Sequence, residues 1–208
     1  MKKRNFLTYG AVASGALTLT LFAGWWQVDG PGATEPVGKR PLPLTQMEFQ
    51  MTDQGGAPVG PKALLGNPSM VFFGFTYCPD VCPTTLSDIS GWLDDLGKDV
   101  AGMNIVFITV DPERDTVDVM AEYVSFFHPA IQGWSGTSDD TRQAAEGFRA
   151  RYEKISKEGD DYTMNHSASV FLFDTEGEFS GTIDSHEPRE FAVPKIRRTF
   201  KRTEEETS

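Results

Sequence analysis

The chain has 208 residues, a formal net charge of −11, and a composition with 39% hydrophobic and 12% aromatic residues. This length and apolar content suffice for one domain with a buried core, which argues against an intrinsically disordered chain. The negative charge, with no basic patch in the body of the chain, excludes nucleic acid as a partner. The sequence has 2 cysteines, too few for a disulfide-rich scaffold.

The N-terminus combines basic residues with a long apolar run. Lys2, Lys3 and Arg4 precede a charge-free stretch from Phe6 to Trp26. As a helix, this stretch is long enough to cross the hydrocarbon core of a bilayer, which is roughly 30 Å thick. The basic residues before it and Asp29 after it favour an N-terminus that stays in the cytoplasm.

A cleaved signal peptide is the alternative, but bulky Leu21, Phe22 and Trp25 surround the small residues at which cleavage would occur. We therefore expect a single-pass protein of a bacterial inner membrane whose soluble domain faces the periplasm. The expected parts are a cytoplasmic stub with a membrane anchor, a linker rich in Gly and Pro, the folded domain, and a disordered tail: residues 1–26, 27–44, 45–200 and 201–208.

Strand-like and helix-like patterns alternate along the folded domain. Continuous apolar runs predict strands buried on both faces, and apolar residues at helical spacing predict helices. In chain order we expect a hairpin, a strand, a helix, a strand, two helices, a hairpin and a helix: residues 48–59, 69–75, 86–96, 104–110, 117–127, 144–152, 170–183 and 188–200. This order predicts a thioredoxin-like α/β sandwich with an added N-terminal β-hairpin.

Cys78 and Cys82 follow the first buried strand and open the first helix. Ligands and chemistry gather at this position in open α/β sheets, and the helix N-terminus stabilises a thiolate there. A spacing of four places both sulfurs on one face of a helical turn. Such a pair suits cuprous ion, zinc or a transient, redox-active disulfide. Pro83 fits the first position of the helix.

Of the three histidines, His166 is the candidate ligand. It precedes the strand at Val170, in a segment that lies beside the dithiol in a thioredoxin-like fold. Oxidoreductases of that fold usually place a proline there, whereas this chain offers an imidazole. Two thiolates and one imidazole suit copper in either oxidation state. His128 and His186 are expected to be surface or capping residues.

The segment after the second buried strand carries Asp111, Pro112, Asp115 and Thr116. Asp before Pro starts a turn, and Asp115 or Thr116 is expected to cap the next helix. A second interpretation of Asp111 is that it tunes the metal site through its ligands.

Two functions fit the dithiol: a metal-binding chaperone, which is not an enzyme, or a thiol-disulfide oxidoreductase acting on an oxidase subunit or another exported protein. Three features count against the oxidoreductase: three residues between Cys78 and Cys82 in place of the usual two, the missing proline, and His166 in its place. A peroxidase of the peroxiredoxin type is less favoured, because the proline of its cysteine loop is absent.

The sequence resembles the Sco/SenC family of copper chaperones from about Phe49 to Phe200. The resemblance is carried by FGFTYCPDVCP at 73–83, ITVDPERDT at 108–116 and DYTMNHSASVFLFD at 161–174. It implies copper, cuprous or cupric, bound by Cys78, Cys82 and His166. It also implies assembly of the dinuclear copper centre on subunit II of cytochrome c oxidase, served by an upstream periplasmic copper donor or thiol reductant. Asn165 departs from the acidic residue that many relatives carry.

Overall fold

The computed structural model describes residues 40–157, 159 and 161–200. The membrane anchor expected at 6–26, most of the expected linker and the expected tail lie outside the described residues. Within the described part, no helix is both long enough and apolar enough to cross a membrane.

A mixed sheet of seven strands organises the domain, in the order β2-β1-β5-β4-β3-β8-β9. Its centre pairs β3 in parallel with β4 and antiparallel with β8. The continuous apolar runs of the sequence form these central strands because both faces of the sheet are covered. The strands are β1 (Met51–Asp53), β2 (Pro58–Val59), β3 (Ser69–Gly74), β4 (Asn104–Thr109), β5 (Ile131–Ser135), β8 (Val170–Phe173) and β9 (Phe179–Ile183).

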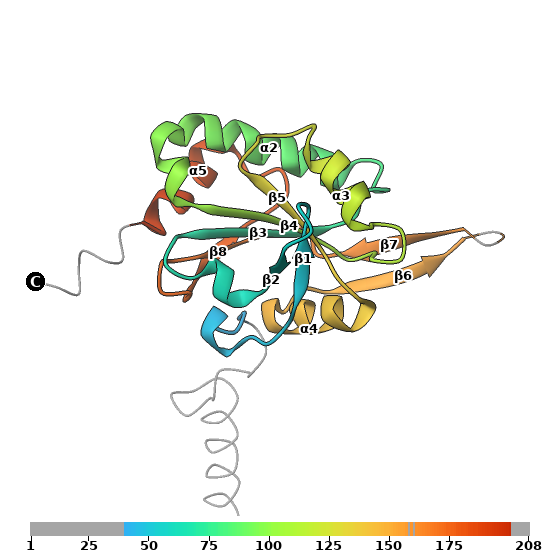
Figure 1. The fold of residues 1–208 in the computed structure, drawn as a ribbon. Helices are drawn as coiled ribbons and strands as arrows, with labels where there is room; N and C mark the ends of the chain where they lie inside the picture. Colours follow the sequence, from blue (N-terminus) through green and yellow to red (C-terminus); the bar gives the residue numbers. More distant parts are fainter. Residues whose placement is uncertain (1–39, 158, 160, 201–208) are drawn as a thin grey trace, which may run out of the picture. The chain divides into compact units, whose positions relative to one another are not determined.

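Helices cover both faces of this sheet (Figure 1). On one face, Phe107 contacts Tyr123 of α3, and on the other, Phe148 of α4 packs against Phe73 and Phe171. The helices are α2 (Val81–Leu96), α3 (Val117–Val124), α4 (Ser138–Phe148) and α5 (Arg189–Arg198), with short 3-10 turns at Leu44–Gln46, Pro61–Leu64 and Gly97–Gly102. The expected α/β sandwich is confirmed, as is the N-terminal hairpin, in which Met51 pairs with Val59.

Two strands form a separate sheet that projects from the domain (Figure 1): β6 (Tyr152–Ser156) and β7 (Tyr162–His166). We call this hairpin the β6–β7 arm. The sequence pattern extended the third helix to Tyr152, which is wrong, because α4 ends at Phe148 and Arg149 adopts a left-handed φ of 56°. The pattern also gave no indication of β5.

Two boundaries differ in detail from the expectations. The helix that carries Cys82 begins at Val81, so Pro83 lies within its first turn and not at its first position. Leu42 and Leu44, which we assigned to the linker, contact the domain: the Leu42 N–H donates to the Gly147 carbonyl, and Leu44 is buried.

Candidate metal centre

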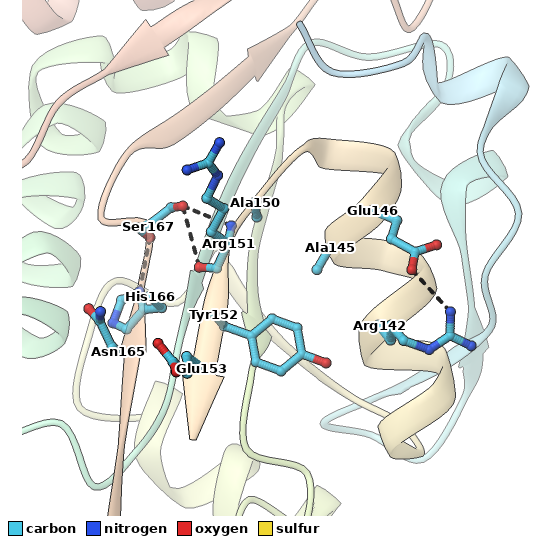
Figure 2. Close-up of a pocket in the computed structure, with 10 residues that line it drawn as sticks. All are labelled: Arg142, Ala145, Glu146, Ala150, Arg151, Tyr152, Glu153, Asn165, His166 and Ser167. Carbon is cyan, nitrogen blue, oxygen red and sulfur yellow. Dashed lines mark hydrogen bonds and ion pairs between the residues drawn. The ribbon is translucent and has the colours of Figure 1, made fainter. Parts of the chain in front are cut away.

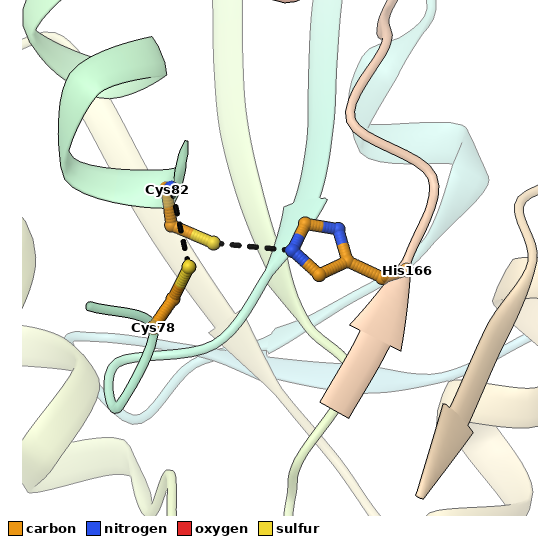
Figure 3. Close-up of side chains that lie close together, drawn as sticks. All are labelled: Cys78, Cys82 and His166. Carbon is orange, nitrogen blue, oxygen red and sulfur yellow. Dashed lines mark hydrogen bonds between the residues drawn. The ribbon is translucent and has the colours of Figure 1, made fainter. Parts of the chain in front are cut away.

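The two cysteines lie where β3 passes into α2. After Gly74 ends β3, the loop turns so that the Cys78 N–H donates to the Phe75 carbonyl at 3.2 Å. Cys82 sits in the first turn of α2 and is fully buried, whereas Cys78 is 9% exposed. The Cys82 backbone N–H, which has no partner within the helix, lies 3.3 Å from the Cys78 Sγ (Figure 3).

His166, the last residue of β7, brings an imidazole to the same place. Its Nε2 lies 3.3 Å from the Cys82 Sγ, and the ligand atoms of the three residues all lie within 4.8 Å of one another (Figure 3). The ring is held edge-on against Phe72 and Phe75. The structure thus brings together the three residues singled out from the sequence.

The hydrogen bonding of His166 settles which ring nitrogen faces the sulfurs. Nδ1 lies 2.9 Å from the Ser167 carbonyl oxygen, which can only accept a hydrogen bond. Nδ1 therefore carries a proton in this contact, and Nε2 is the ring nitrogen that faces the Cys82 Sγ. A backbone carbonyl on the remote nitrogen is the usual way in which proteins orient a metal-binding histidine.

The two thiols ionise very differently. The pKa of Cys78 is lowered to about 4, chiefly by the hydrogen bond from the Cys82 thiol. Burial raises this pKa, whereas hydrogen bonds from His166 and from the backbone N–H groups of Asp80 and Cys82 lower it further. The same hydrogen bond and burial raise the pKa of Cys82. The pair therefore holds one proton, on Cys82, next to a Cys78 thiolate, which is an arrangement typical of a metal-binding or redox-active dithiol.

This asymmetry predicts how the metal-free protein reacts with iodoacetamide. Because its pKa is lowered, Cys78 stays ionised until the pH approaches 4, so its alkylation rate is expected to change little between pH 8 and pH 6. An ordinary thiol of pKa about 8.5 would slow by about a hundredfold over this range. Rates are measured by peptide mass spectrometry, with Cys78→Ser as the control for Cys82 labelling. A rate that falls with pH like that of a free thiol would contradict the low pKa.

A buried carboxylate, Asp115, holds the cysteine loop in place. Its oxygens accept hydrogen bonds from the Thr76 N–H at 3.0 Å, the Thr76 hydroxyl at 2.6 Å and the Thr109 hydroxyl at 2.5 Å. Burial raises the pKa of Asp115, an effect that the hydrogen bonds oppose. Asp115 therefore ties the loop before Cys78 to the end of β4. Of the two caps that we weighed, Thr116 is the N-cap of α3.

Asp111 makes more than a turn. Its carbonyl accepts from the Arg114 and Asp115 N–H groups, as expected for turn chemistry. Its carboxylate also accepts from the Arg114 Nε at 2.5 Å and from the Tyr162 hydroxyl at 2.7 Å. The roles of Arg114, Asp115 and Tyr162 escaped the sequence analysis, because their partners lie up to 51 residues away along the chain.

The other two histidines do not belong to this group of three candidate ligands. The His128 Nδ1 accepts from the Ala130 N–H at 3.1 Å, which is the expected capping role. His186 lies in the loop after β9 with a left-handed φ of 64°. Among the described residues, Cys78, Cys82 and His166 form the one group of three or more Cys, His, Asp or Glu side chains that could share a metal ion.

His166 also lines a groove of about 590 Å³ between α4 and the β6–β7 arm (Figure 2). Its walls carry both charges, including the ion pair between Arg142 and Glu146 at 3.0 Å. The imidazole therefore borders open space on this side, whereas the Cys82 sulfur is enclosed by the core.

Comparison with known proteins agrees with this geometry. The SCO1/SenC family model matches residues 38–201. The mitochondrial protein SCO2 of Saccharomyces cerevisiae is 36% identical over 152 residues, which cover 72% of this chain and 50% of that protein. The chain spans about half to two thirds of the length of the curated relatives that it matches first.

Solved structures of copper-bound relatives share the fold. ScoI of Bradyrhizobium japonicum with copper bound is 41% identical, with a TM-score of 0.69, over 73% of this chain and 97% of that one. Yeast Sco1 with copper bound is 34% identical, with a TM-score of 0.67, over 77% and 92%. The expected thioredoxin-like α/β fold is thereby confirmed. On the extent of the family match, the chain belongs to the SCO1/SenC family.

Proposed function

We propose that this protein is a copper metallochaperone that binds copper through Cys78, Cys82 and His166 and delivers it to the dinuclear copper centre of cytochrome c oxidase subunit II. The observation that carries the proposal is the convergence of two sulfurs and one imidazole nitrogen within 4.8 Å. Donors that each lie about 2.0–2.3 Å from one metal ion must be close to one another in this way. Thiolate and imidazole are the ligands that copper prefers.

The site also has the chemistry of a donor and not of a permanent store. Cys78 is already a thiolate, so loading the site requires only that Cys82 release its proton, and copper affinity rises with pH. Cys82 is fully buried, Cys78 is 9% exposed, and His166 is partly exposed. An incoming thiolate of the client can approach from the Cys78 side and take the ion stepwise, because three ligands leave a coordination position open.

The same proposal includes location. A single-pass anchor at 6–26 would hold the domain at the periplasmic face of the inner membrane, next to the client oxidase. The charge asymmetry around the apolar run supports this orientation. An upstream periplasmic protein would supply copper, or electrons to keep the dithiol reduced.

A thiol-disulfide oxidoreductase is the second candidate, and one observation favours it. A Cys78 thiolate beside a Cys82 thiol is the reduced form of a reactive dithiol. Attack of the Cys78 thiolate on a client disulfide would give a mixed disulfide. Cys82, after losing its proton, would then resolve it, releasing the reduced client and leaving a Cys78–Cys82 disulfide. This reaction needs neither copper nor His166, so that residue separates the two functions.

His166→Ala tests the copper proposal on the purified protein. We expect cupric affinity to fall by at least about a hundredfold. Mutating a residue that only hydrogen-bonds to a metal ligand typically costs about ten- to hundredfold, and losing the ligand itself should cost at least as much. The dithiol should still oxidise, because both sulfurs remain. The control is His186→Asn, since asparagine tolerates the left-handed backbone of that loop. Absorption and electron paramagnetic resonance spectra report cupric binding, and unchanged stoichiometry and spectra would remove His166 from the site.

The same variant tests delivery in the native cell. Cells that carry only His166→Ala are expected to lose oxidase activity and to regain it when copper is added to the medium. Cells with His186→Asn should behave like the wild type. Normal oxidase activity with His166→Ala would favour the oxidoreductase, because that reaction needs only the two cysteines.

A further inference from the structure

The β6–β7 arm positions His166, yet it has no strand partner in the main sheet among the described residues. The backbone enters the arm after α4 and leaves it directly after His166 toward β8. Next to His166, Ser167 forms hydrogen bonds with the backbone N–H and carbonyl of Arg151 across the base of the arm. Farther out, the position of the arm must depend on side-chain contacts with the body of the domain.

Tyr162, at the start of β7, makes those contacts. Its hydroxyl donates to the Asp111 Oδ1 at 2.7 Å, and its carbonyl accepts from the Arg114 Nη1 at 3.1 Å. The Arg114 guanidinium also lies 3.8 Å from the centre of the Tyr162 ring. One residue of the arm is thus held through its hydroxyl, its ring and its backbone.

Arg114 joins this anchor to the cysteine loop. The Arg114 Nε donates to the Asp111 Oδ2 at 2.5 Å, and Asp111 is only 3% exposed. The guanidinium lies 4.8 Å from the centre of the ring of Tyr77, the residue before Cys78. Charge-assisted hydrogen bonds to a buried carboxylate and a cation over aromatic rings are among the stronger polar contacts in proteins. A single side chain therefore touches both segments that supply the ligands.

We propose that Arg114, with Asp111, Tyr77 and Tyr162, forms a clasp that holds the β6–β7 arm at the distance from the cysteine loop at which His166 joins the two sulfurs. This inference rests on the proposed copper function and extends it to a positioning residue that touches neither the metal nor its ligand atoms. Two thiolates alone can hold cuprous ion, whereas cupric ion gains most from the imidazole. The clasp should therefore favour cupric binding selectively.

Arg114→Gln tests the clasp, because glutamine keeps length and polarity but loses the charge and the fork of donors. We expect cupric affinity to fall by about tenfold and cuprous affinity to change by less than about threefold, in line with the loss of an outer partner. Competition with chromophoric copper chelators measures both. Tyr162→Phe is a milder second variant, since it removes only the hydrogen bond to Asp111; its cupric loss should be smaller than that of Arg114→Gln.

Lys154→Gln is the matched control. Lys154 lies on β6, 3.9 Å from the same Tyr162 ring, and pairs with Glu113 at 2.7 Å, but both partners are about half exposed. Exposed ion pairs contribute little. Lys154→Gln, which removes this ion pair, should therefore change cupric affinity by less than about twofold.

Two further measurements decide the inference. In the His166→Ala background, Arg114→Gln should cause no additional cupric loss; equal losses with and without His166, or equal losses of cuprous and cupric affinity, would overturn the clasp. In the metal-free protein, Arg114→Gln should speed hydrogen exchange of the β6–β7 amides, and unchanged exchange would also overturn it. If the wild type binds no copper, the proposed function is wrong. The clasp is then tested only by hydrogen exchange of the β6–β7 amides in Arg114→Gln compared with the wild type.

Discussion

Replacing Cys82 with serine is expected to lower both cuprous and cupric affinity by at least about a hundredfold, since even an outer partner of a metal ligand contributes about ten- to hundredfold. A hydroxyl is a hard, protonated oxygen and a poor ligand for copper. Cys82 is also the group whose hydrogen bond holds the pKa of Cys78 low. The variant therefore removes one ligand and perturbs the second, while the imidazole remains.

Serine nearly matches the volume of cysteine, so the fold should survive this change. Thr85→Ser is a suitable control, because Thr85 is buried in the same helix and lies outside the site. That variant should bind copper like the wild type. Affinities come from chelator competition and folding from thermal unfolding monitored by circular dichroism. Copper bound by Cys82→Ser with wild-type affinity would exclude Cys82 as a ligand and with it the proposed three-ligand site.

Much of this site could be predicted from the sequence because its parts follow strong local signals. The apolar runs at 69–75 and 104–110 mark central strands, and a dithiol directly after the first of them must lie at the carboxyl edge of the sheet. His166 precedes the strand at Val170, which pairs with Phe72 of β3. Its position beside Cys82 thus follows from strand order, before any contact is known.

The elements that were missed carry weak local signals. The strand at Ile131–Ser135 is short and contains a glycine and polar residues, and it is stabilised by neighbours on both sides. In β6, every residue after Tyr152 is exposed, so no apolar alternation marks it. Tyr152 stands at helical spacing from Phe148, yet the left-handed Arg149 ends the helix between them. A non-glycine residue in that conformation is not foreseeable from local pattern.

Asp111, Arg114 and Asp115 illustrate a different limit of sequence reasoning. Their short spacing suggests a turn and a helix cap, and the turn is present. Their side chains nevertheless reach Thr76 and Tyr162, which are distant in sequence. Local chemistry thus predicts the backbone of this segment, while the fold determines which partners its charges meet.

Gly74 is the position where the fold and the site depend most closely on one another. It is the last residue of β3, and it packs against Cys82 in the first turn of α2. A Cβ atom added there would lie 2.7 Å from the Phe107 Cε2 and 2.8 Å from the Cys82 Sγ. Both neighbours are almost fully buried, so neither can move aside easily.

Gly74→Ala is therefore expected to destabilise the protein by about 1–3 kcal/mol, the usual cost of overpacking a core. It should also weaken copper binding by about tenfold, because the displaced Cys82 sulfur no longer meets His166 at 3.3 Å. Chemical denaturation gives the stability and chelator competition gives the affinity.

The same substitution at Gly91 is the matched control. Gly91 lies in α2, the helix that carries Cys82, but a Cβ atom there would meet nothing within 4 Å. Alanine should raise the helix propensity and stabilise the protein by about 0.5–1 kcal/mol, with copper affinity unchanged. If Gly74→Ala proved as stable as Gly91→Ala and bound copper as tightly, this result would contradict the close packing of Gly74 against Cys82 and Phe107.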